Sequence, residues 1–435
     1  MIIKNKKAIL LGFLSSVTAS VVLTTSLHAN SLNRQDQQTS KLESYLKFTK
    51  IVQLIEEQYV DDINASDIIN NALKGMLSNL DAHSSFMDAK ETKELQVQTH
   101  GEFGGLGITV GMKDGALTVI APLEGTPADK AGIKAGDIIL KINELATMGM
   151  TIDKAVSIMR GKPQTAIELT VVRKGAMKPL RIEIIRDIIE IQSVYSKTIG
   201  DDILYMRITS FDQKVVQGLR KGIAEHPNRK GIVLDLRNNP GGLLNQAIGV
   251  VDMFVDEGAI VSQKGKIPEE NLVYNASQAN SDTKTPLVIL VNGGSASASE
   301  IVSGALQDHK RAVVIGNKTF GKGSVQVVMP ISQTEALRLT IARYYLPSGR
   351  TIQAVGVTPD VEVSFGEIKK AEVGISIKER DLQKHLESEL EKVDGKKEEK
   401  DDKEDKTVIT EEQIYKDSQL KSAVDILKAL MITSN

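Results

Sequence analysis

The chain has 435 residues, of which 41% are hydrophobic and 25% charged, and its formal net charge is −2. This length exceeds what one hydrophobic core supports, so we expect several domains in an otherwise ordinary globular protein. The near-neutral charge argues against a protein that binds nucleic acid through phosphate contacts, and the lack of cysteine excludes disulfides, thiolate metal sites and a cysteine nucleophile.

Residues 1–29 have the pattern of a signal peptide. Three lysines within the first seven residues precede an apolar segment, Ala8 to Leu27, and Ala29 offers a small residue for cleavage. The alternative is an uncleaved anchor, which would keep the protein associated with a membrane. Both readings predict an exported protein, periplasmic or on the outer side of the cytoplasmic membrane.

Residues 40–98 are predicted to be helical, because apolar residues recur there at steps of three and four. Such stripes are usually core or interface. We therefore expect this region to contribute to a homo-oligomer, a dimer or a larger assembly.

Residues 99–186 are predicted to form a β-rich domain, since short β-like runs alternate with glycine turns. The loop Gly105-Leu106-Gly107-Ile108, followed by "PADKAGIKAGDIILKINE", resembles a PDZ domain. Successive N–H groups in such a loop can hold a C-terminal carboxylate while the peptide adds to the sheet as a strand. The resemblance implies recognition of free, apolar C-termini.

Residues 187–370 alternate strand-like and helix-like runs, which is typical of an α/β domain. Residues 376–435 form a C-terminal region in which a charged helix, "KERDLQKHLESELEKV", precedes the linker run "DGKKEEKDDKEDK". A single final helix is predicted over residues 410–431, with Thr410 and Gln413 as a capping box. We expect that helix to dock on a partner or on a second copy of the chain.

Ser297 has two interpretations. Among the serines of "GSASASE", only Ser297 has a glutamate three residues later, Glu300, so it is the natural N-cap of the next helix. That accounts for it without any chemistry. A nucleophilic serine at the same place would instead require a neighbouring base.

Two glycine-rich stretches supply further candidates. Lys322 lies between Gly321 and Gly323, and as a base it would need a lowered pKa, for which the apolar Phe320, Val325 and Val327 would provide the surroundings. The alternative is an exposed loop lysine. In "LDLRNNPGG", the amides of Gly241 and Gly242 could form an oxyanion hole with that of Ala298, or simply a strand-to-helix turn.

Four motifs occur in a fixed order, "LDLRNNPGG", "GSASASEIVSGALQD", "TFGKGSVQ" and "ARYYLPSGRTIQAVGVTPD". In this order they resemble the carboxyl-terminal processing peptidases, tail-specific Ser-Lys serine proteases. The resemblance implies a crotonase-like α/β protease core with an inserted PDZ domain and helical N- and C-terminal segments. It also implies Ser297 as nucleophile, Lys322 as general base and Gln326 as the residue that orients the lysine. Glu300 and Asp308 would be supporting carboxylates, and the amides of Gly241, Gly242 and Ala298 would bind the oxyanion. Arg160 would link PDZ occupancy to the active site.

The implied function is a serine endopeptidase that needs no metal or cofactor and cleaves loosely folded tails of exported proteins, with an activating partner protein as a further option. The alternative from another class is a PDZ-based scaffold whose protease site is inert or permanently closed. A nucleotide site is excluded, because Gly323 stands where the P-loop motif requires Ser or Thr.

Overall fold

The computed structural model describes residues 40–277, 281–368 and 407–433, and the chain divides into two units, residues 1–86 and 87–435. The predicted signal peptide and the charged helix predicted before the linker lie outside the described residues. Within the described ranges, none of the helices combines the length and apolar character needed to cross a bilayer.

The first unit is helical as predicted, over residues 40–58 and α2 (Ala65–Ser78). The apolar stripe lies at the surface: Leu46, Ile51 and Leu54 are all more than 40% exposed. The prediction of helix throughout residues 40–98 is wrong at two places: residues 59–64 are not helical, and a turn and a strand separate α2 from the next helix. Asp81 accepts the N–H groups of His83 and Ser84 at 2.7 and 2.8 Å, and this turn leads into the short strand β1 (Ser85–Met87).

In the second unit, α3 (Ala89–His100) leads into the predicted β-rich domain. Its elements are β2 (Glu102–Gly105), β3 (Ile108–Lys113), β4 (Ala116–Pro122), α4 (Pro127–Lys130), β5 (Ile138–Ile142), β6 (Leu145–Ala146), α5 (Ile152–Met159), β7 (Ala166–Val172), β8 (Leu180–Ile185) and β9 (Asp187–Glu190). The sheet runs β3-β4-β5-β7-β8, which leaves β3 at an edge. The entry strand β2 pairs antiparallel with the exit strand β9, so the domain is an insertion held by a two-stranded ribbon.

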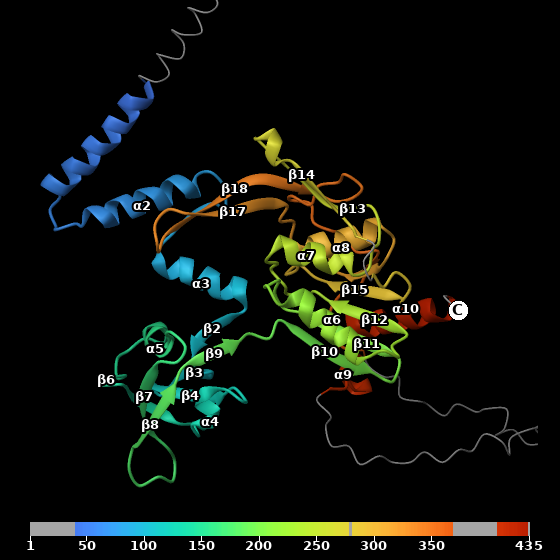
Figure 1. The fold of residues 1–435 in the computed structure, drawn as a ribbon, viewed down its shortest axis with the longest axis horizontal. Helices are drawn as coiled ribbons and strands as arrows, with labels where there is room; N and C mark the ends of the chain where they lie inside the picture. The colour runs from blue at the N-terminus through green and yellow to red at the C-terminus, as the bar shows by residue number, and fades with distance from the viewer. Residues whose placement is uncertain (1–39, 278–280, 369–406, 434–435) are drawn as a thin grey trace, which may run out of the picture. The chain divides into compact units, whose positions relative to one another are not determined.

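The α/β core is built on a sheet in the order β10-β11-β12-β15-β16-β19, parallel except for β10. These strands are Val194–Ile199, Ile203–Ile208, Gly231–Asp235, Leu287–Val291, Val313–Gly316 and Val361–Glu362. Helices α6 (Val215–Glu225), α7 (Leu244–Asp252) and α8 (Ala298–Asp308) cover one face (Figure 1). Every residue of β12 and β15 is buried, as expected for parallel strands covered on both faces.

An antiparallel sheet of long strands packs beside these helices. It contains β17 (Ser324–Pro330), β18 (Ala336–Tyr345), β13 (Ala259–Gly265) and β14 (Leu272–Asn275), paired in that order, with a 3₁₀ turn at Pro268–Glu270. The loop that carries Lys322 leads directly into β17. This sheet therefore positions the lysine relative to α8.

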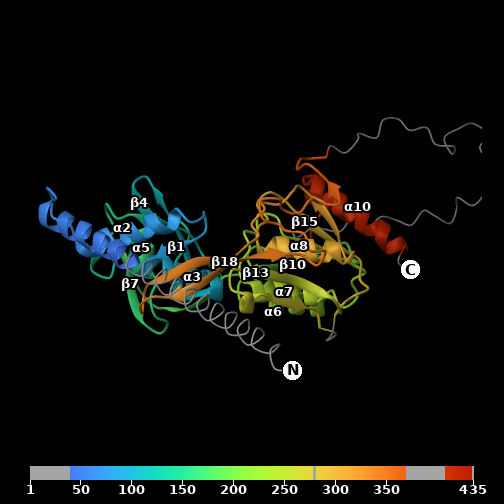
Figure 2. The ribbon, with the colours of Figure 1, turned by 90° about the horizontal axis from the view of Figure 1, so that it is seen from above.

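The C-terminal segment closes the second face of the parallel sheet, as the two views show (Figures 1 and 2). Two predictions are wrong here. The segment forms two helices, α9 (Glu411–Tyr415) and α10 (Ser418–Thr433), because Asp417 starts a new helix by accepting the N–H of Leu420 at 3.0 Å. The helix also packs on its own core, where Ala423, Val424 and Leu427 are buried against the sheet. The predicted capping box at Thr410 is confirmed.

Candidate active site

Ser297 is the N-cap of α8, at the turn that follows β15. Its backbone has φ 53° and ψ −110°, a region that residues with a side chain seldom occupy and that costs about 1–3 kcal/mol. A serine on a strained strand-to-helix turn is also how the nucleophile of many hydrolases is presented. The capping box predicted with Glu300 is present, but this backbone conformation goes beyond what capping requires.

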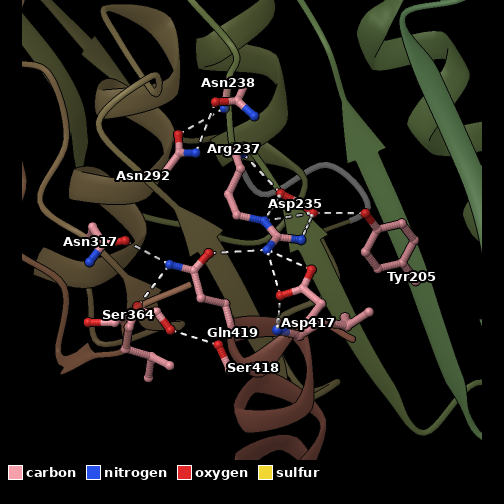
Figure 3. A network of polar contacts seen from close by, with 12 residues as sticks. Tyr205, Asp235, Arg237, Asn238, Asn292, Asn317, Ser364, Asp417, Ser418 and Gln419 are labelled. Atoms are coloured by element: carbon pink, nitrogen blue, oxygen red, sulfur yellow. Dashed lines mark hydrogen bonds and ion pairs between the residues drawn. The ribbon is translucent and has the colours of Figure 1, made fainter. Parts of the chain in front are cut away.

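Glu300 joins the serine to the lysine loop. Its carboxylate is fully buried and accepts the N–H groups of Ser297 and Lys322, each at 2.8 Å, through Oε2. Through Oε1 it accepts the N–H of Gly321 and the hydroxyl of Thr319, each at 2.6 Å. One carboxylate thus fixes the backbone on both sides of the site. Figure 3 shows the neighbouring network at the end of β12.

The other two serines of the turn fasten it to the glycine loop. The Ser295 hydroxyl donates to the Leu236 carbonyl at 2.8 Å, and the Ser299 hydroxyl donates to the Asn239 carbonyl at 2.9 Å. Both serines are fully buried. Three serines lie at the mouth of the helix because two of them hold the loop that faces the third.

The glycine loop lies against the nucleophile candidate. A Cβ added to Gly241 would lie 2.9 Å from the Ser297 Cβ and 3.0 Å from the Ala298 nitrogen. The N–H of Gly241 donates to Asn239 Oδ1 at 2.9 Å and is therefore already engaged. Gly242 has φ 146° and lies against the Phe211 carbonyl, where a Cβ would come within 2.3 Å of the oxygen, so only glycine fits. Ala298 occupies the first helical position, whose N–H has no partner inside a helix.

The lysine loop is only partly apolar. Lys322 is half-buried, Val325 is buried and Val327 is half-buried. Phe320 is 64% exposed, so the prediction that it helps to bury the lysine is wrong; its own N–H is anchored on the Ser295 carbonyl. Gln326 lies on β17, where its amide nitrogen donates to the hydroxyls of Ser324 at 2.8 Å and Thr340 at 3.3 Å.

Asp308 lies at the end of α8 opposite Ser297, about 16 Å away by the rise of an α-helix. It pairs with Arg350 at 2.9 Å and accepts the N–H of Ser348 at 3.0 Å. Asp308 therefore anchors the turn that follows β18. Of the two carboxylates predicted to support the site, only Glu300 lies beside Ser297.

A polar network ends the strand before the glycine loop (Figure 3). Asp235 is fully buried and accepts hydrogen bonds from the Tyr205 hydroxyl at 2.8 Å and from Arg237 Nη2 at 2.6 Å. Arg237 also reaches Asp417 at the start of α10. Burial by itself would lower the pKa of Arg237, but its hydrogen bonds to Asp235 and the charges of Asp235 and Asp417 raise that pKa. Burial and the nearby Asp235 raise the pKa of Tyr205.

In the inserted domain, the loop predicted to bind a carboxylate lies directly before β3. Gly107 has φ 76°, its carbonyl accepts the N–H of Leu123 at 2.8 Å, and a Cβ there would lie 2.3 Å from the Thr126 side chain. The Leu106 side chain is buried in the domain core. Gly105 ends β2, and Ile108 begins β3, whose free edge runs beside α5.

Arg160 directly follows α5. Its guanidinium stacks on Phe103 of the entry strand at 4.5 Å, and the next residue, Gly161, donates its N–H to the Gly104 carbonyl at 3.1 Å. From the same ribbon, Glu102 and Glu190 bind Lys214 of the core at 2.7 and 2.8 Å. A chain of contacts therefore runs from the end of α5 to the start of α6.

Several residues of the site were not predicted from the sequence. They are Tyr205, Asp235, Arg237, Asn239, Asn292, Ser295, Ser299, Thr319, Asp417 and Gln419. Polar residues do cluster in "DLRNN", which marked the loop as functional. Their partners lie up to 182 residues away in the sequence, so spacing gives no signal for them.

A strained serine at the start of a helix, facing a glycine loop on an α/β sheet, is typical of a serine hydrolase, here with a β-rich domain inserted before it. Family models agree: residues 202–363 match peptidase family S41, residues 118–173 match a PDZ domain, and residues 14–92 match the N-terminal domain of the activating protease CtpB.

The chain is 45% identical over 353 residues to the carboxy-terminal-processing protease of Bartonella bacilliformis, covering 79% of this chain and 81% of that protein. It is 34% identical over 371 residues to the carboxy-terminal processing protease CtpA of Bacillus subtilis, covering 84% and 79%. A solved photosystem II D1 C-terminal processing protease is 29% identical with a TM-score of 0.43, covering 73% of this chain and 92% of that one. The chain belongs to the carboxy-terminal-processing serine proteases of peptidase family S41.

Proposed function

We propose that Ser297 and Lys322 are the nucleophile and general base of a peptidase that cleaves tails of exported proteins delivered by the PDZ domain. The observation that carries this proposal is the buried Glu300, whose single carboxylate accepts the N–H groups of both Ser297 and Lys322 at 2.8 Å. A base and a nucleophile need such a fixed relation for proton transfer.

In this mechanism, neutral Lys322 takes the proton from the Ser297 hydroxyl while the serine oxygen forms a bond to the scissile carbonyl carbon. The N–H groups of Gly242 and Ala298 donate to the oxyanion, since that of Gly241 is engaged by Asn239. Lys322 then protonates the leaving amine as the C–N bond breaks. Water then attacks the acyl carbon while Lys322 takes its proton, and the bond to the Ser297 oxygen breaks as Lys322 returns that proton to the serine. The carboxylic product leaves, and Gln326 orients the lysine throughout.

The PDZ domain takes the free end of the substrate in this proposal. The N–H groups around Gly107 receive the terminal carboxylate, and the tail adds along the free edge of β3. Arg160, stacked on Phe103 of the entry strand, couples an occupied groove to the core. Preferred substrates are loosely folded proteins with apolar C-termini.

The setting of the enzyme is part of the proposal. Residues 1–29 are a signal peptide or a retained membrane anchor, so the enzyme acts in the periplasm or on the outer side of the cytoplasmic membrane. The exposed apolar stripe of residues 40–58 assembles a homo-oligomer, and a partner protein activates it. In this proposal the regions of the enzyme are residues 40–98, 99–186, 187–370 and 376–435.

The test uses the purified chain and three variants: Ser297→Ala, Lys322→Ala and, as a matched control, Lys318→Ala, an exposed lysine of the same loop. Each is incubated with a loosely folded protein ending in apolar residues, with and without an amidated C-terminus, and fragments are read by mass spectrometry. We expect the parent and Lys318→Ala to cleave, the other two to be inactive, and amidation to slow cleavage.

Cleavage by Ser297→Ala would contradict the assignment of Ser297 as nucleophile. Equal cleavage of the free and the amidated substrate would contradict recognition of the terminal carboxylate. Inactivity of every form would favour the closed scaffold. A second pair tests the PDZ loop: Gly107→Ala should lose tail binding, whereas Gly115→Ala, with nearly the same φ but open space around it, should keep it.

A further inference from the structure

Arg237 connects the glycine loop of the active site to the C-terminal segment. Its guanidinium binds Asp235 through Nε and Nη2 at 3.0 and 2.6 Å, and its Nη1 binds Asp417 at 2.9 Å and Gln419 Oε1 at 3.1 Å (Figure 3). The side chain is only 11% exposed. All three guanidinium nitrogens therefore have fixed partners: Nε and Nη2 bind Asp235, and Nη1 binds Asp417 and Gln419.

The start of α10 is itself rigidly held. Gln419 is 1% exposed, and its amide nitrogen donates to Asn317 Oδ1 and to the Val363 carbonyl, both at 2.8 Å. Ser418 donates to the Ser364 carbonyl at 2.7 Å. These partners follow strands β16 and β19, so the helix start is fixed to the carboxyl edge of the parallel sheet, the edge that also carries the active-site loops.

The residue after Arg237 begins the loop that faces Ser297. Asn238 exchanges hydrogen bonds with Asn292 at 2.9 and 3.0 Å, and Asn239 directs its oxygen to the Gly241 N–H. The loop is thus fixed on the α8 side by Asn292 and Ser299 and on the other side by Arg237. A misplacement of about 1 Å at such a loop can cost about a hundredfold in rate.

Docking of α10 does not by itself require this polar network. The helix already buries Ala423, Val424 and Leu427 against the sheet. A buried ion pair adds little net stability over apolar packing, because desolvation offsets the attraction. Docking of α10 on the sheet therefore does not explain why the charged contacts lie at the active-site edge.

We propose that Asp417 and Gln419 act as positioning residues of the active site: they hold Arg237, and through it the loop of Gly241 and Gly242, in the geometry that binds the oxyanion. This inference rests on the proposed role of that loop. It makes the start of α10, residues 417–419, a working part of the catalytic site, while the rest of the helix packs on the sheet.

The test uses the full chain with Asp417→Asn, its conservative partner Asp417→Glu, and Leu427→Ala as the control. Leu427 is fully buried on the same helix but about 15 Å along it from Asp417, against Gly231. At a temperature where all forms are folded, Asp417→Asn should lower kcat about tenfold with KM within twofold of the parent. Asp417→Glu should recover part of the loss. Leu427→Ala should lower the unfolding temperature more but leave kcat unchanged.

An unchanged kcat in Asp417→Asn, or an equal loss in Leu427→Ala, would overturn the inference. A second readout does not depend on peptidase activity: hydrogen exchange of the backbone amides of Asn239, Gly241 and Leu243. Asp417→Asn should speed their exchange about tenfold and Leu427→Ala should not. Unchanged exchange would contradict the positioning role, even if the parent were inactive on every substrate. If only the proposed function were wrong, the faster exchange in Asp417→Asn would still be observed.

Discussion

Two fully buried carboxylates flank the glycine loop, and their partners differ in kind. Glu300 is satisfied by three backbone N–H groups and one hydroxyl, and the farthest of these donors lies 22 residues away in the sequence. Asp235 is satisfied mainly by the side chains of Tyr205 and Arg237, and through Arg237 it is linked to Asp417. Backbone donors fix the path of the chain at one place. Side-chain donors link segments that are far apart in the sequence, so that a shift of one segment moves the others.

Of the substitutions around these two carboxylates, Glu300→Gln should lower stability and peptidase activity the most. A glutamine offers one oxygen, so two of the four donors would face an NH₂ group, and each unsatisfied buried donor costs about 1–3 kcal/mol. We expect about 3 kcal/mol less free energy of unfolding in urea and a loss of peptidase activity of about a hundredfold or more. Glu362→Gln, at an exposed position, is the control and should change neither quantity.

Asp235→Asn should come next. The amide keeps the shape but leaves the buried Arg237 with only Asp417 as an anionic partner, and breaking a buried pair costs about 3 kcal/mol. Activity should fall about tenfold, less than in Glu300→Gln, because Ser299 and Asn292 still hold the loop. An activity loss larger than that of Glu300→Gln, measured with the same substrate, would reverse the comparison.

Thr319→Val removes one hydroxyl from the Glu300 side. That hydroxyl donates to Glu300 and accepts the N–H of Val357 at 2.7 Å, so two buried groups lose a partner. The free energy of unfolding should fall by about 2 kcal/mol. Thr319→Ser keeps the hydroxyl and should stay close to the parent in the same urea titration. A serine variant as unstable as the valine variant would assign the effect to packing.

Tyr205→Phe should have the smallest effect. It removes one donor from Asp235, while Arg237 keeps three hydrogen bonds to that carboxylate. The free energy of unfolding should therefore fall by about 1 kcal/mol, and peptidase activity should stay within twofold of the parent. Thermal unfolding and a kcat measurement check both numbers. A large loss of activity with this mild change would mean that Tyr205 itself contributes to the loop geometry.

The same contrast explains how much could be predicted from the sequence. The strand and helix order of the core and the Ser297–Glu300 capping box follow from local periodicity and spacing. The Glu300 contact to Lys322 was missed, because nothing in the sequence brings a loop 22 residues away back to the helix. The break at Asp417 was missed as well, since the apolar pattern of residues 410–431 continues across it. Asp417 begins the new helix by accepting the N–H of Leu420, and its other partner, Arg237, lies 180 residues upstream, where sequence spacing gives no signal.

The segment that covers the second face of the parallel sheet is also the last to be synthesised among the described residues. Until Leu420 to Leu427 have left the ribosome, Tyr205, Val233, Val288 and Leu290 have no helix to cover them. Chains are made from the N-terminus, and domains usually fold as units in that order. A nascent chain that has not yet reached α10 therefore exposes the apolar second face of the sheet, even though Ser297 and Lys322 have already been made.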